Sequence, residues 1–318
     1  MTTKTPLIID TDPGIDDAVA LAIALNHANL DVRLITTVSG NVDVRQTTEN
    51  TLKLVSFMKK EVPVAKGCDQ PLLIKLEDAS EIHGETGMAG FEFPKSHAKA
   101  LPYHAVEAMR KTLESSEEPV VILAIAALTN IALLFSLYPE MKAKVSKIVM
   151  MGGTLSRGNT NSSAEFNTYV DPHAAQIVFQ SGVPIVMVGL DVTSTAVLAS
   201  KEVELIKGLG RVGQMFHALF QHYRGGSLKT GLKMHDVCAV AYLVQPELFQ
   251  TQATHVEVAL EGPGEGPSEG PAAGCSVADL KMKYHTDTNC EVCLAIDVPA
   301  FQEWLVENLE MSGDKLHD

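Results

Sequence analysis

Short apolar, β-branched runs alternate along this chain with segments of helical period, which is the pattern of repeated βα units around a mostly parallel sheet. Runs of the strand type lie at 6–10, 32–38, 62–65, 119–125, 146–151 and 183–190. Segments with helical period lie at 16–28, 43–60, 103–115, 129–138, 172–181, 201–223 and 236–244. The sequence therefore predicts an α/β fold, with an open and mostly parallel sheet flanked by helices.

The domain organisation follows from the length and from one unusual segment. No linker divides the first 250 residues, so we expect a single domain over 1–318 with a late helical and β elaboration. The segment 261–272 is a tandem repeat of Glu-Gly-Pro followed by Gly, Ser or Ala. Gly and Pro at this density do not hold a helix or a central strand, which predicts an exposed loop within the domain.

Composition narrows the class of partner. Asp and Glu total 39 against 25 Lys and Arg, a net charge of -14, which disfavours nucleic acid as a partner. No run approaches the roughly 20 apolar residues of a membrane helix, and the start lacks a signal-peptide pattern, so we expect a cytoplasmic protein with no membrane partner. The five cysteines suit reduced core thiols, and the lone C-x-x-C at Cys290 and Cys293 is a poor zinc signature.

Four aspartates fall within eight residues where the first predicted strand gives way to a helix: Asp10, Asp12, Asp16 and Asp17. One of them alone could cap the helix or complement its dipole. Four carboxylates this close repel one another, so the fold needs a cation or a hydrogen-bonding substrate to compensate. Carboxylate oxygens suit a hard cation, and an irregular cage favours Ca²⁺, with Mg²⁺ as the alternative.

Two other readings of this aspartate motif fit less well. A D-x-D phosphatase of the haloacid dehalogenase type has Thr or Val two residues after the second Asp, where this chain has Gly14. An EF-hand loop counted from Asp10 needs Gly at its sixth position and Glu at its twelfth, which here are Ile15 and Leu21.

Three later clusters of polar residues also lie at junctions between predicted elements. In open α/β sheets, ligands bind outside the carboxyl ends of the strands, so these clusters should meet the aspartates. Each has an ordinary reading as turn or cap chemistry, but Asn and Glu also bind several sugar hydroxyls at once, and a His can donate a proton. The candidate residues are His83 in one loop, Asn159, Glu165, Phe166 and Asn167 in a second, and His235 and Asp236 in a third.

Taken in order, these motifs resemble those of the inosine-uridine-preferring nucleoside hydrolases, from about residue 7 to about residue 300. The matching segments are D-T-D-P-G-I-D-D from Asp10, T-T-V-S-G-N at 36–41, H-G-E-T-G at 83–87, L-T-N at 128–130, M-G-G at 151–153, A-E-F-N at 164–167 and M-H-D at 234–236. The likeness is greatest to the broad-specificity bacterial ribonucleoside hydrolases. It implies the nucleoside hydrolase fold, whose core is Rossmann-like.

The resemblance also implies a role for each candidate residue. Ca²⁺ would be bound by Asp12, Asp17, Asp236 and the backbone carbonyl of Ile125, and waters and the ribose 2′- and 3′-hydroxyls would complete its shell. The remaining site residues would be substrate contacts or supports: Asp16 and Asn167 on the ribose diol, Asn159 and Glu165 on the 5′ side, Met151 and Phe166 along the sugar, Asn41 and Asp10 supporting the acidic residues, and His83, Tyr223 and His235 around the base.

The implied reaction is hydrolysis of the N-ribosidic bond of purine and pyrimidine ribonucleosides in nucleoside salvage, by a homo-oligomer, either a dimer or a tetramer. Asp12 would take the proton of a calcium-activated water, and His235 would assist the departing base. Because water attacks directly, we expect inversion at the anomeric carbon.

One departure from the family pattern bears on this function. The family usually carries Gly-Pro where this chain has Ala126 and Ala127, directly after the carbonyl expected to bind calcium. A backbone conformation that only Gly tolerates would weaken the metal site here. The alternatives are therefore a nucleoside- or ribose-binding protein that has lost turnover and, further away, a metal-dependent phosphohydrolase of the D-x-D type.

Overall fold

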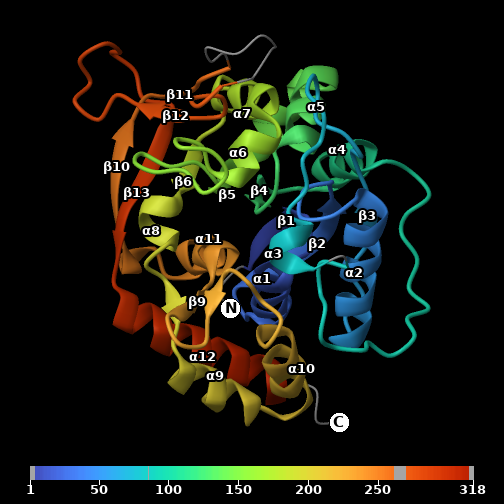
Figure 1. Ribbon diagram of the computed structural model, residues 1–318. Helices are drawn as coiled ribbons and strands as arrows, with labels where there is room; N and C mark the ends of the chain where they lie inside the picture. The colour runs from blue at the N-terminus through green and yellow to red at the C-terminus, as the bar shows by residue number, and fades with distance from the viewer. Residues whose placement is uncertain (1–3, 85, 261–269, 315–318) are drawn as a thin grey trace.

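The computed structural model describes residues 4–84, 86–260 and 270–314, which form helices on both sides of a central eight-stranded sheet (Figure 1). The strand order is β10-β13-β6-β5-β4-β1-β2-β3. In chain order the strands are β1 (Thr5–Thr11), β2 (Leu30–Thr37), β3 (Val64–Lys66), β4 (Val120–Ala124), β5 (Val145–Met151), β6 (Ile185–Val188), β10 (Phe249–Thr254) and β13 (Cys290–Ile296).

All neighbouring strands of this sheet are parallel except the edge strand β10, which is antiparallel to β13. The six predicted strands are confirmed as β1 to β6, and with them the mostly parallel sheet. The last of them is shorter than predicted, because the chain leaves the sheet at Gly189 and Leu190 begins the short helix α8 (Leu190–Thr193).

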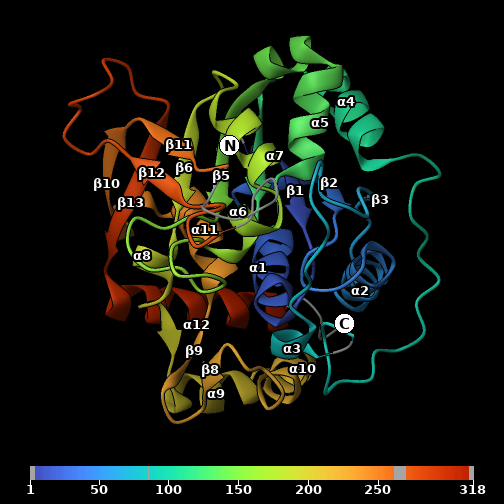
Figure 2. The ribbon, with the colours of Figure 1, turned by 45° about the horizontal axis from the view of Figure 1, so that its top comes forward.

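Successive strand residues point to opposite faces, so the sheet is buried on both sides. Ile9 on β1 joins one apolar core cluster and Ile8 joins the other. Figure 2 shows α4 and α5 on one side of β1 and β2 and α1 on the other. The helices are α1 (Ile15–Asn26), α2 (Val44–Phe57), α3 (Ser80–His83), α4 (Ala105–Ser115), α5 (Thr129–Leu137), α6 (Phe166–Val170), α7 (Pro172–Phe179), α9 (Ser200–Lys207), α10 (Gly210–Phe220), α11 (His235–Val244) and α12 (Val298–Asp314).

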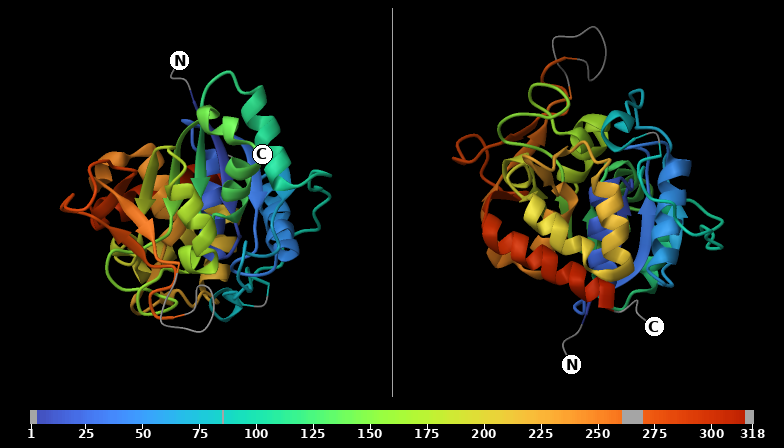
Figure 3. Two further views of the ribbon diagram at one scale, coloured as in Figure 1. Left: turned by 90° about the horizontal axis from the view of Figure 1, so that it is seen from above. Right: turned by 60° about the horizontal axis from the view of Figure 1, so that its bottom comes forward.

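The helix predicted at 201–223 is wrong in one respect, because the chain forms two helices there. α9 ends at Lys207 with Gly208 as its C-cap, and α10 begins at Gly210, whose φ of +62° lies in the left-handed region that favours glycine. Both helices pack against the C-terminal helix α12, which the sequence patterns had not indicated (Figure 3).

Two small sheets complete the fold. β7 (Val197–Leu198), β9 (Gly231–Lys233) and β8 (Gly226–Ser227) form one, and β11 (Val256–Val258) and β12 (Ser276–Ala278) form the other. Most of the predicted Glu-Gly-Pro loop, 261–269, lies outside the described residues. Its last residues, from Gly270, enter a turn in which the Ala273 N–H donates to the Gly270 carbonyl.

All five cysteines are free thiols. Cys290 and Cys293 belong to the core clusters on opposite faces of the sheet, so this C-x-x-C cannot converge on one metal ion. Within the part of the chain that the structure describes, no helix is both long and apolar enough to cross a membrane.

Candidate active site

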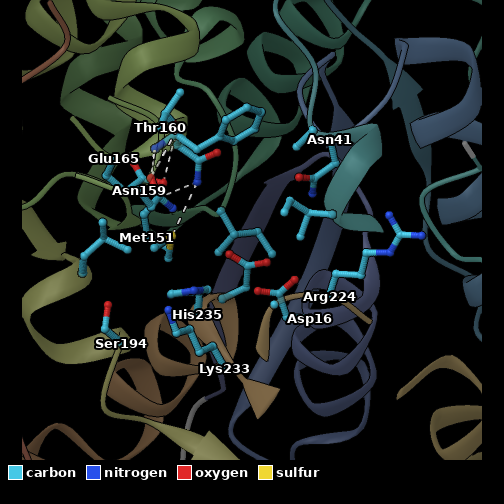
Figure 4. A pocket seen from close by; sticks show the side chains of 18 of the residues that line it. Asp16, Asn41, Met151, Asn159, Thr160, Glu165, Ser194, Arg224, Lys233 and His235 are labelled. Carbon is cyan, nitrogen blue, oxygen red and sulfur yellow. Dashed lines mark hydrogen bonds between the residues drawn. The ribbon is translucent and has the colours of Figure 1, made fainter. Parts of the chain in front are cut away.

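A cavity of about 260 Å³ opens at the carboxyl ends of the parallel strands, where the loops after β1, β2, β4, β5 and β6 meet the start of α11. Figure 4 shows Glu165, Asn159 and Met151 on one side of it, Asn41 and Asp16 on the other, and His235 between. Most of the predicted site residues line it: Asp12, Asp16, Asn41, Ile125, Met151, Asn159, Glu165, Phe166, Asn167, Tyr223, His235 and Asp236.

Five aspartates gather at the floor of the cavity, and we call them the acidic cluster: Asp10, Asp12, Asp16, Asp17 and Asp236. All five side chains are buried. They come together because α1 begins directly after β1 and packs against α11, whose first turn carries Asp236. The structure thus joins residues more than 200 positions apart in the sequence.

Neutral donors hold the lower members of this cluster in place. Asp10 accepts hydrogen bonds from Thr36 Oγ1 at 2.6 Å and from Asn130 Nδ2 at 2.8 Å. Asp17 accepts from Thr11 Oγ1 at 2.7 Å and from the Gly14 N–H at 2.9 Å. Neither residue lines the cavity, so both support the floor from beneath.

The turn after β2 positions Asp12. The backbone N–H of Asn41 donates to Asp12 Oδ2 at 2.6 Å, and Asn41 Nδ2 donates to the Asp12 carbonyl and to Asp17 Oδ2, each at 3.1 Å. A Cβ on Gly40 would overlap Oδ2 and lie 3.0 Å from Cγ, so only glycine lets the turn come this close. The predicted supporting position of Asn41 therefore has a physical basis.

The electrostatics of the acidic cluster call for a cation. Burial raises the pKa of Asp10 to about 7 and, together with the charge of Asp17, the pKa of Asp16 to about 7. Burial and neighbouring aspartates raise the pKa values of Asp12 and Asp236 well above the usual range. The neighbouring charges that raise these pKa values are carboxylates of the cluster itself, and a bound metal ion is the compensation that fits the donor set.

The possible ligands differ in part from those expected. One carboxylate oxygen from each of Asp16, Asp17 and Asp236 lies within 4.8 Å of the others. Asp12 stands beside this trio and interacts with it electrostatically. Asp16, Asp17 and Asp236 could therefore hold one metal ion together, and Asp12 lines the cavity next to them.

The two alanines that depart from the family pattern fit their positions. Among the residues that the structure describes, only Lys59 and Met282 combine a side chain with positive φ, so Ala126 and Ala127 have ordinary backbone conformations. Ala126 packs against Val38 and Cys68. The backbone strain that would have weakened the metal site is therefore absent at these alanines. The structural argument for a binding protein without turnover rested on that strain and no longer applies.

The wall opposite the acidic cluster is built around Glu165, the N-cap of α6. Its carboxylate accepts backbone N–H bonds from Asn167 at 2.9 Å, Gly153 at 3.0 Å and Thr168 at 3.2 Å. Burial raises the pKa of Glu165 to about 7 despite these bonds. Asn167 Nδ2 donates to the Met151 carbonyl at 3.0 Å, and Asn159 Oδ1 accepts from the Phe166 N–H at 2.9 Å. This wall is therefore rigid and polar.

The third side of the cavity comes from α11 and the segment before it. His235 Nδ1 lies 2.7 Å from Thr193 Oγ1, which orients the imidazole ring. The Tyr223 hydroxyl donates to the Lys233 carbonyl at 3.0 Å, and the ring lies beside Asp16. The predicted residue His83 ends α3, but its side chain lies outside the described part of the structure.

Several lining residues escaped the sequence reasoning. Leu190 begins α8, the short helix after β6, and Ser194 follows that helix, so the rule that ligands bind at carboxyl ends of strands could have found them. The others lie in loops or in the short elements α3, β8 and β9, which carry no such signal: Ala79, Ile82, Thr160, Arg224, Gly225, Gly226 and Lys233.

Comparison with known proteins identifies the family. The family model described as inosine-uridine preferring nucleoside hydrolase matches residues 7–303. The chain belongs to this family. It is 46% identical over 307 residues to the non-specific ribonucleoside hydrolase RihC of Salmonella paratyphi B, a match that covers 96% of this chain and 98% of the relative.

Solved nucleoside hydrolases share the whole fold. The purine-preferring ribonucleoside hydrolase from Gardnerella vaginalis superposes with a TM-score of 0.89 at 30% identity, covering 98% of this chain and 100% of the other. A plant nucleoside hydrolase gives a TM-score of 0.88 at 29% identity, covering 96% and 99%. This nucleoside hydrolase is thus an enzyme that hydrolyses N-glycosyl bonds, as its motifs indicated, and the phosphohydrolase alternative falls away.

Proposed function

We propose that this nucleoside hydrolase releases the base from purine and pyrimidine ribonucleosides, in a Ca²⁺-dependent reaction that serves nucleoside salvage. The broad specificity is supported by the near full-length likeness to a non-specific ribonucleoside hydrolase. The observation that carries the chemistry is the acidic cluster, which faces a polar wall of Glu165 and Asn167 across a cavity of about 260 Å³.

The donor set of the cluster fits a hard divalent cation held by Asp17 and Asp236, with Asp16 and Asp12 alongside and the Ile125 carbonyl at the rim. A calcium ion bound there supplies positive charge that keeps the carboxylates ionised and polarises water and ribose hydroxyls. Asp10 and Asn41 hold the cluster in register from the two neighbouring strand ends.

Asp12 is the proposed general base. Asn41 fixes its Oδ2, and Asp12 lines the cavity next to the carboxylates that would hold the cation. It takes a proton from the water that attacks the anomeric carbon. Because water attacks directly and no covalent intermediate with the protein forms, the configuration at the anomeric carbon is inverted in the product.

The remaining residues of the cavity handle the ribose and the base. Cleavage of the N-ribosidic bond develops positive charge on the sugar ring, which the buried carboxylates of Asp16 and Glu165 stabilise. Asp16 and Asn167 bind the ribose diol, Asn159 and Glu165 bind the 5′ side, and Met151 and Phe166 line the sugar.

His235 assists the departing base. When the Thr193 hydroxyl donates a hydrogen bond to Nδ1, the neutral imidazole carries its proton on Nε2, where it can donate a hydrogen bond to a nitrogen of the departing base. Tyr223 and His83 are the other proposed neighbours of the base.

A substrate panel tests the proposal. The protein is incubated with inosine, uridine, cytidine, adenosine and a phosphomonoester, with and without chelator, while free ribose and phosphate are measured. We expect ribose to be released from both purine and pyrimidine nucleosides. The chelator should abolish this release and added Ca²⁺ should restore it. Phosphate release, or ribose release that is indifferent to the chelator, would contradict it.

The variant Asp12→Asn tests the role of the base. It preserves the shape of the side chain and the hydrogen bond from Asn41, so the fold should remain intact while kcat falls by roughly 10² to 10⁴, the range for losing a general base. A wild-type kcat in this variant would rule Asp12 out as the base.

The cellular setting is also part of the proposal. We expect all of 1–318 to act as one domain in a cytoplasmic homo-oligomer, a dimer or a tetramer. Light scattering on the purified protein measures the oligomeric state, and a monomer would refute that part alone.

A further inference from the structure

A second group of metal-ligand side chains lies far from the acidic cluster in the fold. One ligand atom each from His255, Glu257 and His285 falls within 4.8 Å of the others. His255 precedes β11, Glu257 lies on β11, and His285 belongs to the loop between β12 and β13. Neither the family motifs nor the proposed reaction uses any of these residues.

The position of this histidine group separates it from the active site. It follows β10, whose last residue Thr254 pairs with Cys290, the first residue of β13. Since β13 runs parallel to β6, Cys290 marks the amino ends of the parallel strands. The active site lies at the carboxyl ends of these strands, so the histidine group and the acidic cluster lie at opposite ends of the strands. In Figure 1, β11 and β12 form the corner above the end of β10.

Both imidazole rings are oriented by oxygen acceptors at Nδ1. His285 Nδ1 lies 3.4 Å from Asp279 Oδ2, and His255 Nδ1 lies 3.3 Å from the Asp287 carbonyl. An N–H at Nδ1 places the lone pair on Nε2, and this pairing of an imidazole with a carboxylate or carbonyl is how metal-binding histidines are usually held. His285 Nε2 faces Glu257 Oε1 at 3.9 Å.

The support for His285 is built into its loop. Asp279 accepts backbone N–H bonds from Lys283 at 2.9 Å, Tyr284 at 2.6 Å and His285 at 3.0 Å. Only 9% of the Asp279 side chain is exposed, against 30% for His285 and 52% for Glu257. The supporting carboxylate is thus fixed inside the loop, while the His285 and Glu257 side chains are partly open to solvent and that of His255 is 17% exposed.

We propose that His255, Glu257 and His285 form a second metal site, specific for a transition-metal ion of the zinc type. Two imidazole nitrogens and one carboxylate oxygen, with a fourth position for water, match the ligands and number that Zn²⁺ accepts. Calcium prefers six to eight oxygen ligands, which this group does not offer. The proposal does not depend on the proposed function of the active site.

Zinc binding changes the local geometry in a defined way. The two rings are stacked, with centroids 3.8 Å apart and an interplanar angle of 1°. A metal ion lies in the plane of each imidazole that binds it, and two parallel planes share no such point, so the rings must splay as the ion enters. The bound ion then links β11 to the loop before β13 and stiffens this edge of the molecule.

Metal titration of the full-length protein tests the site. The protein is stripped with chelator, dialysed and titrated with Zn²⁺ against a chromophoric competitor, and Co²⁺ is added in parallel to read the visible absorption of a four-coordinate site. The variants are His285→Ala, His255→Ala and Glu257→Gln, and His97→Ala, an exposed histidine elsewhere, is the matched control. Any binding of Zn²⁺ at the acidic cluster is the same in the wild type and in all the variants, so it does not contribute to the differences between them.

We expect the wild type and His97→Ala to bind one equivalent of Zn²⁺ at this site, in addition to any that binds the acidic cluster. In His285→Ala and His255→Ala the affinity of that equivalent should fall by about 100-fold or more, since loss of an outer partner alone costs about 10- to 100-fold. Circular dichroism and Ca²⁺-supported ribose release should be unchanged, which shows that the variants are folded. Equal stoichiometry and affinity in the wild type and both histidine variants would overturn the proposal.

Discussion

Gly40 controls where the proposed base stands, and Gly40→Ala makes that control measurable. A Cβ at this position would overlap Asp12 Oδ2 and lie 3.0 Å from Cγ, whereas ordinary contacts begin near 3.4 Å. The φ of Gly40 is not in the left-handed region, so alanine is tolerated by the backbone itself. The strain therefore falls on the Asp12 carboxylate, which must withdraw by about 1 Å to restore normal contact.

That shift has two costs. A displacement of about 1 Å at a reacting group lowers the rate by roughly 10²-fold, so kcat for ribose release should fall by about that factor. Losing the 2.6 Å bond from the Asn41 N–H leaves a buried donor unpaired, which costs about 1–3 kcal/mol of stability. Part of this is offset by the lower chain entropy of alanine in the unfolded state, about 0.4–1 kcal/mol.

The assay compares kcat for inosine with the urea midpoint of the same preparation. Gly208→Ala is the control, because its Cβ would meet only the Leu205 carbonyl, at 3.3 Å, near the end of α9. The control should retain its kcat. If Gly40→Ala also kept the wild-type kcat, the reasoning that ties the rate to the position of Asp12 would fail.

Three further perturbations probe the same floor. In chelator, the raised carboxyl pKa values of the acidic cluster mean that the folded state binds more protons than the unfolded state. The stability of the folded state should therefore fall as pH rises from about 4 to about 7. A thermal midpoint in chelator that rises with pH over this range would contradict this expectation. Ala126→Gly should lower stability by about 0.4–1 kcal/mol and leave the Ca²⁺ affinity unchanged, since Ala126 has an ordinary φ; a gain in affinity by calorimetry would argue otherwise. Asn130→Ala removes bonds to Asp10, to the Thr37 carbonyl and from the Cys68 N–H, and should cost about 3 kcal/mol in urea unfolding; a loss below 1 kcal/mol would show that these groups find other partners.

Much of this enzyme could be predicted because its signals are local. Short apolar runs marked β1 to β6, and the polar clusters after β1, after β5 and at the start of α11 were expected to meet, since the carboxyl ends of parallel strands lie at one edge. Asn41, after β2, was expected from the family resemblance alone. The break between α9 and α10 was missed because a glycine costs a helix only about 1 kcal/mol, so the apolar period alone continued through it.

Other features depend on packing and carry no local signal. Asp16 and Asp17 are neighbours on α1, and whether both face Asp236 is decided by how α11 packs on α1. Likewise, Thr193 reaches His235 only because α8 lies beside α11. The edge pair β10 and β13 and the helix α12 complete the sheet and its cover late in the chain.

The cavity is divided between two kinds of support, and this division separates what can vary from what cannot. The side proposed for the sugar rests on strand ends and on the N-cap Glu165, where each polar group is bound by several others, so a substitution there disturbs its neighbours. The side proposed for the base rests on α3 and on the segment that carries Arg224. Solved relatives named for a purine or an inosine-guanosine preference share this backbone at TM-scores of 0.89 and 0.87, so a difference in base preference requires no change of fold.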